Sequence, residues 1–551
     1  MIQRVKEAGA KKETVKAMKQ LVLEFQDVFR MELGHDPPAK VEPMEVRLME
    51  GEDLKMNRAR RFAPLQMEFL DKHVKLLLEM GVIKKSKSDY ASPIVLARKG
   101  DGSWRMCVDL RRINARTKTM PWPLPKIQEI LPHLAGAVVF STFDLLRGYW
   151  QFPVTPDSSK NLAFVTHNGM YEFTRMVMGA KNSASHFQKV MTEVMDGLIL
   201  QNLLVYIDDI LVFADSEEKL IQVIREVFKR LREFGIKVKP TKCNLFATSI
   251  LWCGMIVDKE GLKINPATVE AARSMVPPGD AAQLQQFLAS CNWVRNFIPA
   301  FAQVIAPLQN LLNAALSGAK KRNARTAKKI SLKEVGWDRE HDESFEALKT
   351  ALVNAVCNAH PRDDRVLCLF PDASYEFWGS ILTQVPEEDI RSDKPISEWE
   401  HEPLAFLSGV FRGAQLRWGV PDKEGFAIKE SCARLSHLLV RRGGFRMFTD
   451  HRNLRYIFNP VGVVSQVSKP QADRLERWAV YLRCFEYTIE HIAGALNVWA
   501  DMLSRWAPGT RRHLEQRERG RNTTRSEVHE KAAAVMLRVR SDRILTEAGH
   551  V

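Results

Sequence analysis

The chain has 551 residues, of which 45% are hydrophobic, so it can bury several cores and lacks the composition of a disordered protein. Its formal net charge of +15 favours a polyanionic partner, because Lys and Arg neutralise phosphates, although a basic surface without such a partner is also compatible. The cysteines are scattered singly without C-x-x-C spacing, which argues against a zinc knuckle and a secreted disulfide scaffold. No apolar run is long enough for a signal core or a membrane span. Together these features predict an intracellular protein without a membrane partner.

The first half of the sequence predicts a mixed fold of helices and strands. Residues 1–45 contain a short amphipathic segment and then polar, proline-containing chain. The segments expected to be helical are 65–80, 182–200, 215–234 and a region that continues to about 316. The segments expected to form strands are 92–110 around a turn at 100–102, 138–143, and 203–213 as a hairpin.

A basic, weakly hydrophobic run at 318–333 predicts a linker and the main domain boundary. A solvated charge run is the favoured interpretation there, with a nucleic-acid contact as the alternative. Beyond it, strands are expected at 366–370, 445–448 and 485–489, and helices at 424–439, 473–481 and 496–506. The tail from Arg511 is charged.

Two adjacent aspartates, Asp208 and Asp209, lie inside the apolar run 205–213. Neighbouring carboxylates repel each other and resist burial, so a cation should offset their cost, and Mg²⁺ takes such oxygen ligands. Asp144 ends another buried strand, and carboxylates from two strands can hold two ions about 4 Å apart for in-line phosphoryl transfer. The alternative, a plain polar turn, is disfavoured by the apolar frame.

Four further carboxylates lie at or near the ends of separate apolar segments in the second half: Asp372, Glu424, Asp450 and Asp501. Any one of them alone would be interpreted as a surface residue. As a convergent set they suggest a second two-metal site, which would place water for attack on a phosphodiester.

Several motifs now point to a family. Tyr206-Ile-Asp-Asp-Ile-Leu-Val resembles the Tyr-x-Asp-Asp signature of reverse transcriptases, and the stretch around Asp144 resembles the strand with their first catalytic aspartate. Other stretches resemble the fingers strand, the helix start after the nucleotide pocket and the approach to the primer grip: 102–114, 178–188, 242–243 and 251–254. Their order is most similar to the gypsy class of long-terminal-repeat retrotransposon Pol polyproteins, over roughly residues 20–506.

The second constellation fits the same resemblance. The stretches around Asp372, Asp450 and Asp501 resemble three ribonuclease H motifs. Trp418-Gly-Val-Pro-Asp-Lys-Glu resembles the retrotransposon helix start, which assigns Glu424 rather than Asp422 to the site. His491 is interpreted either as a proton shuttle and product-release residue or, equally, as a surface histidine.

The resemblance implies a multidomain α+β and α/β fold: a right-hand polymerase with fingers, palm and thumb, then a ribonuclease H-like mixed sheet flanked by helices. The implied divisions are an N-terminal extension (1–45), fingers and palm (46–257), a thumb-like helical region (258–316), a basic linker (317–336), the ribonuclease H domain (337–506) and a charged tail (507–551).

It further implies an RNA-directed DNA polymerase with ribonuclease H activity and two Mg²⁺ ions per site, with Mn²⁺ also suited to oxygen ligands. Arg105, with Lys99 or Arg98 near it, would contact the incoming deoxynucleoside triphosphate, Tyr149 would act as a steric gate against a 2′-hydroxyl, and Lys242 would protonate pyrophosphate. The alternatives are a surface salt bridge for Arg105, a core aromatic for Tyr149 and a solvated side chain for Lys242. Partners would be an RNA template, a DNA primer and the RNA–DNA hybrid.

The sequence lacks a protease triplet and an integrase zinc set, so it is interpreted as part of a larger polyprotein or a truncated element, with protease and integrase as companion products and a dimer as compatible. A cytoplasmic virus-like particle or the nucleus is the expected location. Met178 and Pro371 depart from the family pattern without removing a metal ligand. A catalytically inactive remnant that binds nucleic acid is the alternative, disfavoured by the intact carboxylates; an RNA-dependent RNA polymerase is disfavoured by Tyr149 and the attached ribonuclease H.

Overall fold

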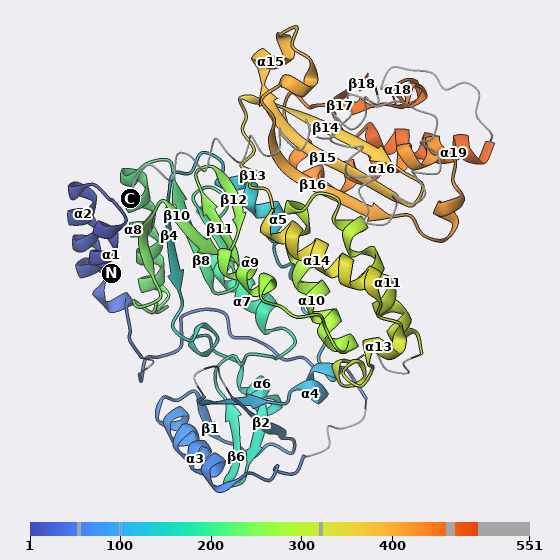
Figure 1. Cartoon of the computed structure of the whole chain (residues 1–551). Helices are drawn as coiled ribbons and strands as arrows, with labels where there is room; N and C mark the ends of the chain where they lie inside the picture. The colour runs from blue at the N-terminus through green and yellow to red at the C-terminus, as the bar shows by residue number, and fades with distance from the viewer. Residues whose placement is uncertain are drawn as a thin grey trace. The chain divides into compact units, whose positions relative to one another are not determined.

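The computed structural model describes residues 1–32, 34–51, 57–98, 100, 102–318, 323–458 and 469–493 (Figure 1). The chain forms two compact units. The first comprises Met1–Cys253 with Val257–Lys259, and the second comprises Gly254–Ile256 with Glu260–Val551. The division therefore falls within the hairpin of β10 (Ser249–Trp252) and β11 (Met255–Asp258), well before the basic segment at 317–336.

The first unit contains two sheets. One, the fingers sheet, has the strand order β1-β6-β5-β2-β3: Ile83–Lys85, Gly169–Phe173, Ala163–Thr166, Ser92–Arg98 and Trp104–Val108. The other, the palm sheet, has the order β7-β8-β4-β9: Leu203–Tyr206, Asp209–Ala214, Val139–Asp144 and Asn244–Ala247. Apolar side chains dominate β4 and β8, so this sheet is buried except where the strands end in aspartates.

The first unit also contains helices, several of which contact these sheets. They are α1 (Ile2–Glu7), α2 (Lys12–Glu24), α3 (Pro64–Glu79), α4 (Arg111–Arg116), α5 (Ile127–Ile130), α6 (Pro156–Asn161), α7 (Ser183–Val194) and α8 (Glu217–Glu233), with short 3₁₀ turns at Gln26–Val28, Leu131–Leu134 and Gly148–Gln151. The apolar face of α8 lies against the palm sheet, where Phe228 and Phe143 of β4 have ring centroids 5.1 Å apart. The 3.6-residue apolar period of 215–234 predicted this helix and its buried face.

The second unit begins with strands and helices that lead into a mixed sheet. Its first elements are β12 (Gly261–Ile264), α9 (Pro266–Arg273), α10 (Ala281–Trp293), a 3₁₀ turn (Arg295–Phe297), α11 (Phe301–Ser317), α12 (Ala324–Ala327), α13 (Leu332–Val335), α14 (Arg339–Val353) and β13 (Asn358–Ala359). β12 and β13 pair antiparallel, and Gly261 allows the approach because a Cβ there would lie 2.1 Å from the Asn358 carbonyl oxygen.

The mixed sheet has the order β16-β15-β14-β17-β18. Its strands are Glu402–Val410, Phe377–Pro386, Arg365–Ala373, Phe445–Thr449 and Tyr487–His491, in that order. β14 pairs parallel with β17, and β17 parallel with β18, while the other pairs are antiparallel. The accompanying helices are α15 (Glu387–Arg391), α16 (Val420–Arg434), α17 (Ser436–Leu439), α18 (Arg452–Ile457) and α19 (Lys469–Leu482), with 3₁₀ turns at Ile396–Glu398 and Gly413–Arg417.

The helical part of the second unit packs on the edge strand β16. Arg295 donates a hydrogen bond to the Ser408 carbonyl oxygen at 2.7 Å, and the Ser408 hydroxyl accepts one from the Ala302 backbone N–H at 2.9 Å. α11 and α14 pack against each other. The helices before residue 354 and the mixed sheet therefore form one compact unit.

Two expectations from sequence differ from the structure. The region from 235 to about 316 was expected to be helical, but β9 to β12 occupy much of 244–264, because alternating burial of short apolar pairs competes with the helical period there. The predicted basic linker contains α12 and α13, whose Ala327 and Leu332 are buried, so this segment is anchored by apolar contacts despite its charge.

Candidate active sites

The β7–β8 hairpin presents Asp208 and Asp209 at its tip. Tyr206 pairs with Asp209 across the hairpin, which leaves Ile207 and Asp208 as the two turn residues. Ile207 has a φ of +57°, the left-handed region that a β-branched residue rarely adopts. This tight turn holds Asp208 beside the end of β8.

Asp144 lies directly opposite Asp209. The two are Cα partners at the end of the antiparallel pair β4–β8, so the structure brings together all three carboxylates predicted for the polymerase site. Desolvation raises the pKa of Asp208, and the charge of Asp144 raises it further. Asp209 is exposed, yet desolvation and the charges of Asp208 and Asp144 raise its pKa as well. The site is therefore rich in negative charge and favourable to a cation.

Lys242 provides a cation at this site. Its Nζ lies 2.8 Å from Asp144 Oδ2, and this hydrogen bond raises the pKa of Lys242, with the charges of Asp208 and Asp209 acting in the same direction. A lysine so held is protonated at neutral pH. Lys242, predicted to act on pyrophosphate, thus lies within the carboxylate cluster.

Tyr149 lies beside the same carboxylates. Its half-buried ring packs on Phe187 with a centroid distance of 5.1 Å, and desolvation followed by the charge of Asp208 raises the pKa of its hydroxyl. Gly148 permits this packing: a Cβ there would lie 3.0 Å from Phe187 Cζ and 3.5 Å from Asp208 Cβ. Tyr149 therefore lies beside the turn that carries Asp208.

Arg105 lies on β3 of the fingers hairpin, in a different sheet from the strands that carry the three aspartates. Arg105 is exposed on β3, opposite Ala97 of β2, while Lys99 lies outside the described residues. Arg98 stacks over Trp104 at 4.8 Å. Met178 is 66% exposed beside Gly179, so its departure from the family pattern affects a surface rather than a core.

Gln188 is a residue of this site that the sequence did not single out. It is buried on α7 and hydrogen-bonds to the backbone on both sides of Tyr206. Its position next to Phe187 in the motif at 178–188 was the available signal, but nothing in the sequence says that it reaches the hairpin.

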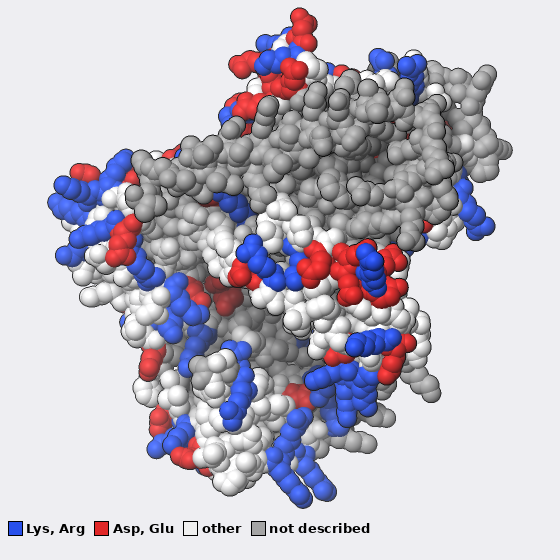
Figure 2. All heavy atoms as spheres, viewed as in Figure 1, with Lys and Arg blue, Asp and Glu red and all other residues white. Residues whose placement is uncertain are grey.

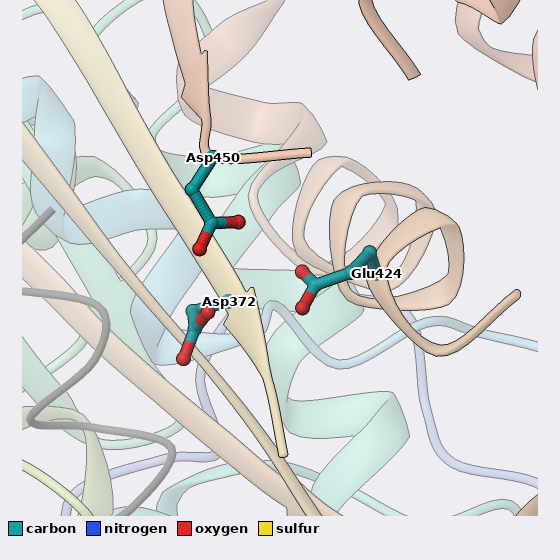
Figure 3. A group of neighbouring side chains, drawn as sticks. All are labelled: Asp372, Glu424 and Asp450. Atoms are coloured by element: carbon teal, nitrogen blue, oxygen red, sulfur yellow. The ribbon is translucent and has the colours of Figure 1, made fainter. Parts of the chain in front are cut away.

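In the second unit, Asp372, Glu424 and Asp450 converge (Figure 3). Each offers a carboxylate oxygen, and these oxygens all lie within 4.8 Å of one another. Asp372 comes from the central strand β14, Glu424 from α16, and Asp450 follows the adjacent strand β17. Asp372 and Glu424 are buried, so the cluster is the kind of closely spaced acidic set that binds divalent cations.

Asp422 has a different role from Glu424, although the two lie within one turn of α16. Asp422 is 3% exposed at its side chain and forms a two-pronged ion pair with Arg474 of α19, at 3.2 and 3.1 Å. It points into helix packing, whereas Glu424 joins the acidic cluster. The assignment of Glu424 from the sequence motif agrees with this geometry.

Of the other predicted nuclease residues, Asp501 lies outside the described residues, and His491 is the last residue of β18. His491 is the Cα partner of Thr449, the residue before Asp450, so it lies at the same end of the sheet as the cluster. His451, which follows Asp450, is a half-buried histidine whose pKa is lowered by desolvation.

Basic side chains gather over the fingers part of the first unit. Figure 2 shows Lys and Arg side chains clustered on the face that holds α4. Exposed arginines of this region are Arg58, Arg60, Arg61, Arg105, Arg111 and Arg112. Among the residues that the structure describes, no helix has the length and apolar character needed to cross a bilayer.

Two family profiles match the parts of the chain that hold these carboxylates. A profile described as "Reverse transcriptase (RNA-dependent DNA polymerase)" matches residues 97–257, which contain Asp144, Asp208 and Asp209. A profile described as "RNase H-like domain found in reverse transcriptase" matches residues 362–485, which contain Asp372, Glu424 and Asp450.

Relatives and solved structures were found over most of the chain. The Transposon Tf2-3 polyprotein of Schizosaccharomyces pombe is 28% identical over 443 residues, covering 80% of this chain and 31% of the relative. The Transposon Tf2-7 polyprotein of the same organism is 27% identical over the same length. The chain thus spans about a third of the length of these curated relatives.

Structures of a foamy viral protease-reverse transcriptase share the fold. The complex with an RNA/DNA hybrid has a TM-score of 0.71 and 21% identity, covering 92% of this chain and 63% of that chain. The complex with dsDNA has a TM-score of 0.72, covering 89% of this chain and 96% of that chain. The predicted fold, a right-hand polymerase followed by a ribonuclease H-like mixed sheet, is confirmed. The chain therefore carries a reverse transcriptase domain, of the RNA-dependent DNA polymerase family, followed by a ribonuclease H-like domain.

Proposed function

We propose that the chain copies the RNA of a gypsy-class long-terminal-repeat retrotransposon into DNA and degrades the RNA of the resulting hybrid. The observation that carries the proposal is the cross-strand placement of Asp144 opposite Asp209, with Asp208 at the adjoining turn. Like charges held directly opposite each other destabilise a sheet, so their retention indicates a task that needs them.

The polymerase residues fit divalent cations. Asp144, Asp208 and Asp209 would hold two ions, Mg²⁺ or Mn²⁺, and the raised pKa values of Asp208 and Asp209 indicate negative charge that a bound cation would stabilise. Such ions lower the pKa of a primer 3′-hydroxyl and stabilise charge on the reacting phosphate. Lys242 would then be released from Asp144 to donate its proton to the departing pyrophosphate.

Binding of the incoming nucleotide would involve the fingers and the loop after β4. Arg105, with Lys99, would contact the triphosphate by charge, and the Tyr149 ring would exclude a 2′-hydroxyl from the space beside Asp208. Tyr149 is supported by Phe187 below it, which would keep the ring in a fixed place. Selection of deoxynucleotides would follow from this packing.

The nuclease residues also fit divalent cations. Asp372, Glu424 and Asp450 present oxygens at ligand spacing, and Asp501 would complete the set. These residues would position water against a phosphodiester of the RNA strand, and His491, from the end of β18, would shuttle a proton or assist product release.

Both activities in one chain suit one substrate. Copying RNA yields an RNA–DNA hybrid, and tethering raises the effective concentration of that hybrid at the nuclease site. The proposed partners are an RNA template, a DNA primer, deoxynucleoside triphosphates and the other products of a Pol polyprotein, in a virus-like particle or the nucleus. We also propose the domain limits inferred from the sequence, with the ribonuclease H domain at 337–506.

The proposal is tested by primer extension on an RNA template with Mg²⁺, comparing the wild-type chain with Asp208→Asn. We expect extension with deoxynucleotides by the wild type and a loss of at least about 10²- to 10³-fold in Asp208→Asn, the scale of removing one electrostatic group from an active site. A folded wild type that extends no primer would favour the inactive remnant, and extension with ribonucleotides alone would favour an RNA polymerase.

The nuclease half is tested separately with a labelled RNA–DNA hybrid. Asp450→Asn should abolish cleavage of the RNA strand while leaving primer extension intact, because the two acidic clusters use no common residue. Loss of both activities in this variant would contradict the assignment of two independent sites.

A further inference from the structure

Gln188 contacts the backbone of the hairpin that carries Asp208 and Asp209. Its Oε1 accepts a hydrogen bond from the Ile207 backbone N–H at 2.8 Å, and its Nε2 donates one to the Val205 carbonyl oxygen at 3.2 Å. One partner is a donor and the other an acceptor, so only one orientation of the amide satisfies both. Gln188 therefore holds the chain on both sides of Tyr206.

These backbone groups need a partner from outside the sheet. β7 is the edge strand of the palm sheet, and Tyr206 uses its pairing side toward Asp209 of β8. Groups on neighbouring residues of a strand point to opposite sides, so Val205 directs its carbonyl oxygen away from β8, on the outer side of the edge strand. The Ile207 N–H, in the turn that follows, bonds to the same side chain. The Gln188 side chain takes the place of a further strand.

The turn also has a conformation that requires support. Tight two-residue hairpin turns favour Gly or Asn where φ is positive, yet Ile207 occupies this position with a φ of +57°. A β-branched residue persists there only when its surroundings fix it. The hydrogen bond from the Ile207 N–H to Gln188 acts on the strained residue itself.

Burial makes the support rigid. Gln188 is 4% exposed, and its neighbour Phe187 is fully buried against Tyr149 and Phe152. α7 thus holds Gln188 in place by apolar packing on one side and by hydrogen bonds on the other. A shift of the turn would move Asp208 relative to Asp144, because β4 and β8 are otherwise fixed by their pairing.

We propose that Gln188 is a positioning residue that sets the geometry of the metal-binding turn, and so determines how tightly the polymerase carboxylates hold divalent cations. This inference rests on the proposed polymerase function. Gln188 does not contact the reacting groups; it acts through the backbone of Val205 and Ile207.

The test compares Gln188→Met with Asn202→Leu in the full chain. Methionine keeps the length and volume of glutamine but cannot make both hydrogen bonds. Asn202 is a matched control, because its Nδ2 donates to the Phe213 carbonyl oxygen at 3.2 Å at the opposite end of the same hairpin. Both variants lose a side-chain amide that holds backbone, but only one is at the metal-binding turn.

In primer extension, Gln188→Met should lower kcat at least about tenfold and raise the Mg²⁺ concentration for half-maximal rate several-fold, with the KM for deoxynucleotide within about twofold of wild type. Asn202→Leu should leave the Mg²⁺ requirement and kcat unchanged, even if its melting temperature falls as far. Equal losses in both variants, or wild-type kinetics in Gln188→Met, would overturn the inference.

A second readout needs no turnover. Mn²⁺ binding is measured by electron paramagnetic resonance in an Asp450→Asn background, which weakens ion binding at the nuclease cluster. Gln188→Met should bind Mn²⁺ several-fold more weakly than its parent, and Asn202→Leu should not. A parent that binds Mn²⁺ but extends no primer would refute the polymerase function while still testing Gln188. Equal Mn²⁺ affinity in Gln188→Met and in the parent would overturn the inference. So would a parent that binds Mn²⁺ no more tightly than Asp208→Asn in the same background.

Discussion

At the scale of single residues, the polymerase site holds ionisable carboxylates in surroundings that disfavour their charged form. Burial and the neighbouring carboxylates raise the pKa of Asp208, so the folded state disfavours the ionised group that the chemistry needs. Lys242 offsets part of this through Asp144. Stability and function therefore oppose each other at this position.

Replacing Asp208 with Asn is accordingly expected to stabilise the chain. Because the folded-state pKa lies above the unfolded value near 3.8, the ionised carboxyl reduces stability once pH rises through the folded pKa, and this penalty is absent below the unfolded value. Calorimetry in a chelator should give Asp208→Asn the higher melting temperature at neutral pH, with the two curves converging toward pH 4. Added Mg²⁺ should stabilise wild type more than the variant. A lower melting temperature for Asp208→Asn at neutral pH would refute the electrostatic account.

A second prediction at this scale concerns Tyr149 and the discrimination between deoxynucleotides and ribonucleotides. Tyr149→Ala removes the ring beside Asp208 and should relax discrimination against ribonucleotides by about 10- to 200-fold, the range for a lost steric contact. The measurement is the ratio of kcat/KM for a deoxynucleotide and its ribonucleotide. Trp150→Ala is the control, because Trp150 contacts Arg147 and His73 instead and should leave the ratio unchanged.

At the scale of elements, α16 is held in place by a buried ion pair. Asp422 lies in the first turn of α16 and pairs with Arg474 of α19, whose guanidinium stacks over the Trp418 ring. Glu424 follows within the same turn and enters the acidic cluster. Packing between two helices thus helps to set the position of a carboxylate in the acidic cluster.

Arg474→Met should therefore destabilise the second unit by about 3 to 5 kcal/mol, because it leaves the Asp422 carboxylate buried without its partner. Nuclease activity should fall with it, whereas polymerase activity at moderate temperature should persist. Arg477→Met is the matched control, since Arg477 is exposed on the same helix, where it donates a hydrogen bond to the Asp473 carbonyl oxygen one turn earlier. Denaturant unfolding of both variants provides the comparison, and equal stability would contradict the prediction.

Sequence patterns located the elements with regular periods. The helix at 215–234 and the strands leading to Asp144 and Asp372 were predicted within a few residues, because their apolar spacing reflects one buried face. The motifs also nominated the acids that converge. The contacts of Gln188 with Ile207 and of Arg474 with Asp422 could not be predicted, since each joins segments whose proximity exists only in the tertiary fold.

At the scale of the whole molecule, the helices that follow the palm belong with the nuclease sheet. Arg295 and Ala302 satisfy polar groups of Ser408, which is buried on the edge strand β16. An edge strand left uncovered is prone to pair with other chains. The helical region therefore protects this edge of the nuclease sheet.

A fragment that begins at Glu260 should consequently be more stable than one that begins at Trp337. The longer fragment keeps β12, α10 and α11, whereas the shorter one loses Arg295 and the helix over β16. We expect the shorter fragment to melt at least about 5 °C lower and to aggregate more readily, as judged by calorimetry and light scattering. Equal melting temperatures and solubility would indicate that β16 needs no cover.

Because Asp144 and Asp209 are cross-strand partners, the polymerase site depends on both side chains lying on the same face of the sheet. Side chains along a strand alternate between the two faces, so one residue inserted or deleted within β8 would turn Asp209 to the opposite face relative to the apolar residues beyond the change. Reading-frame-preserving insertions near this hairpin would thus be far more harmful than most substitutions. The position of these carboxylates therefore depends more on the number of residues in the strand than on the identity of most of its side chains.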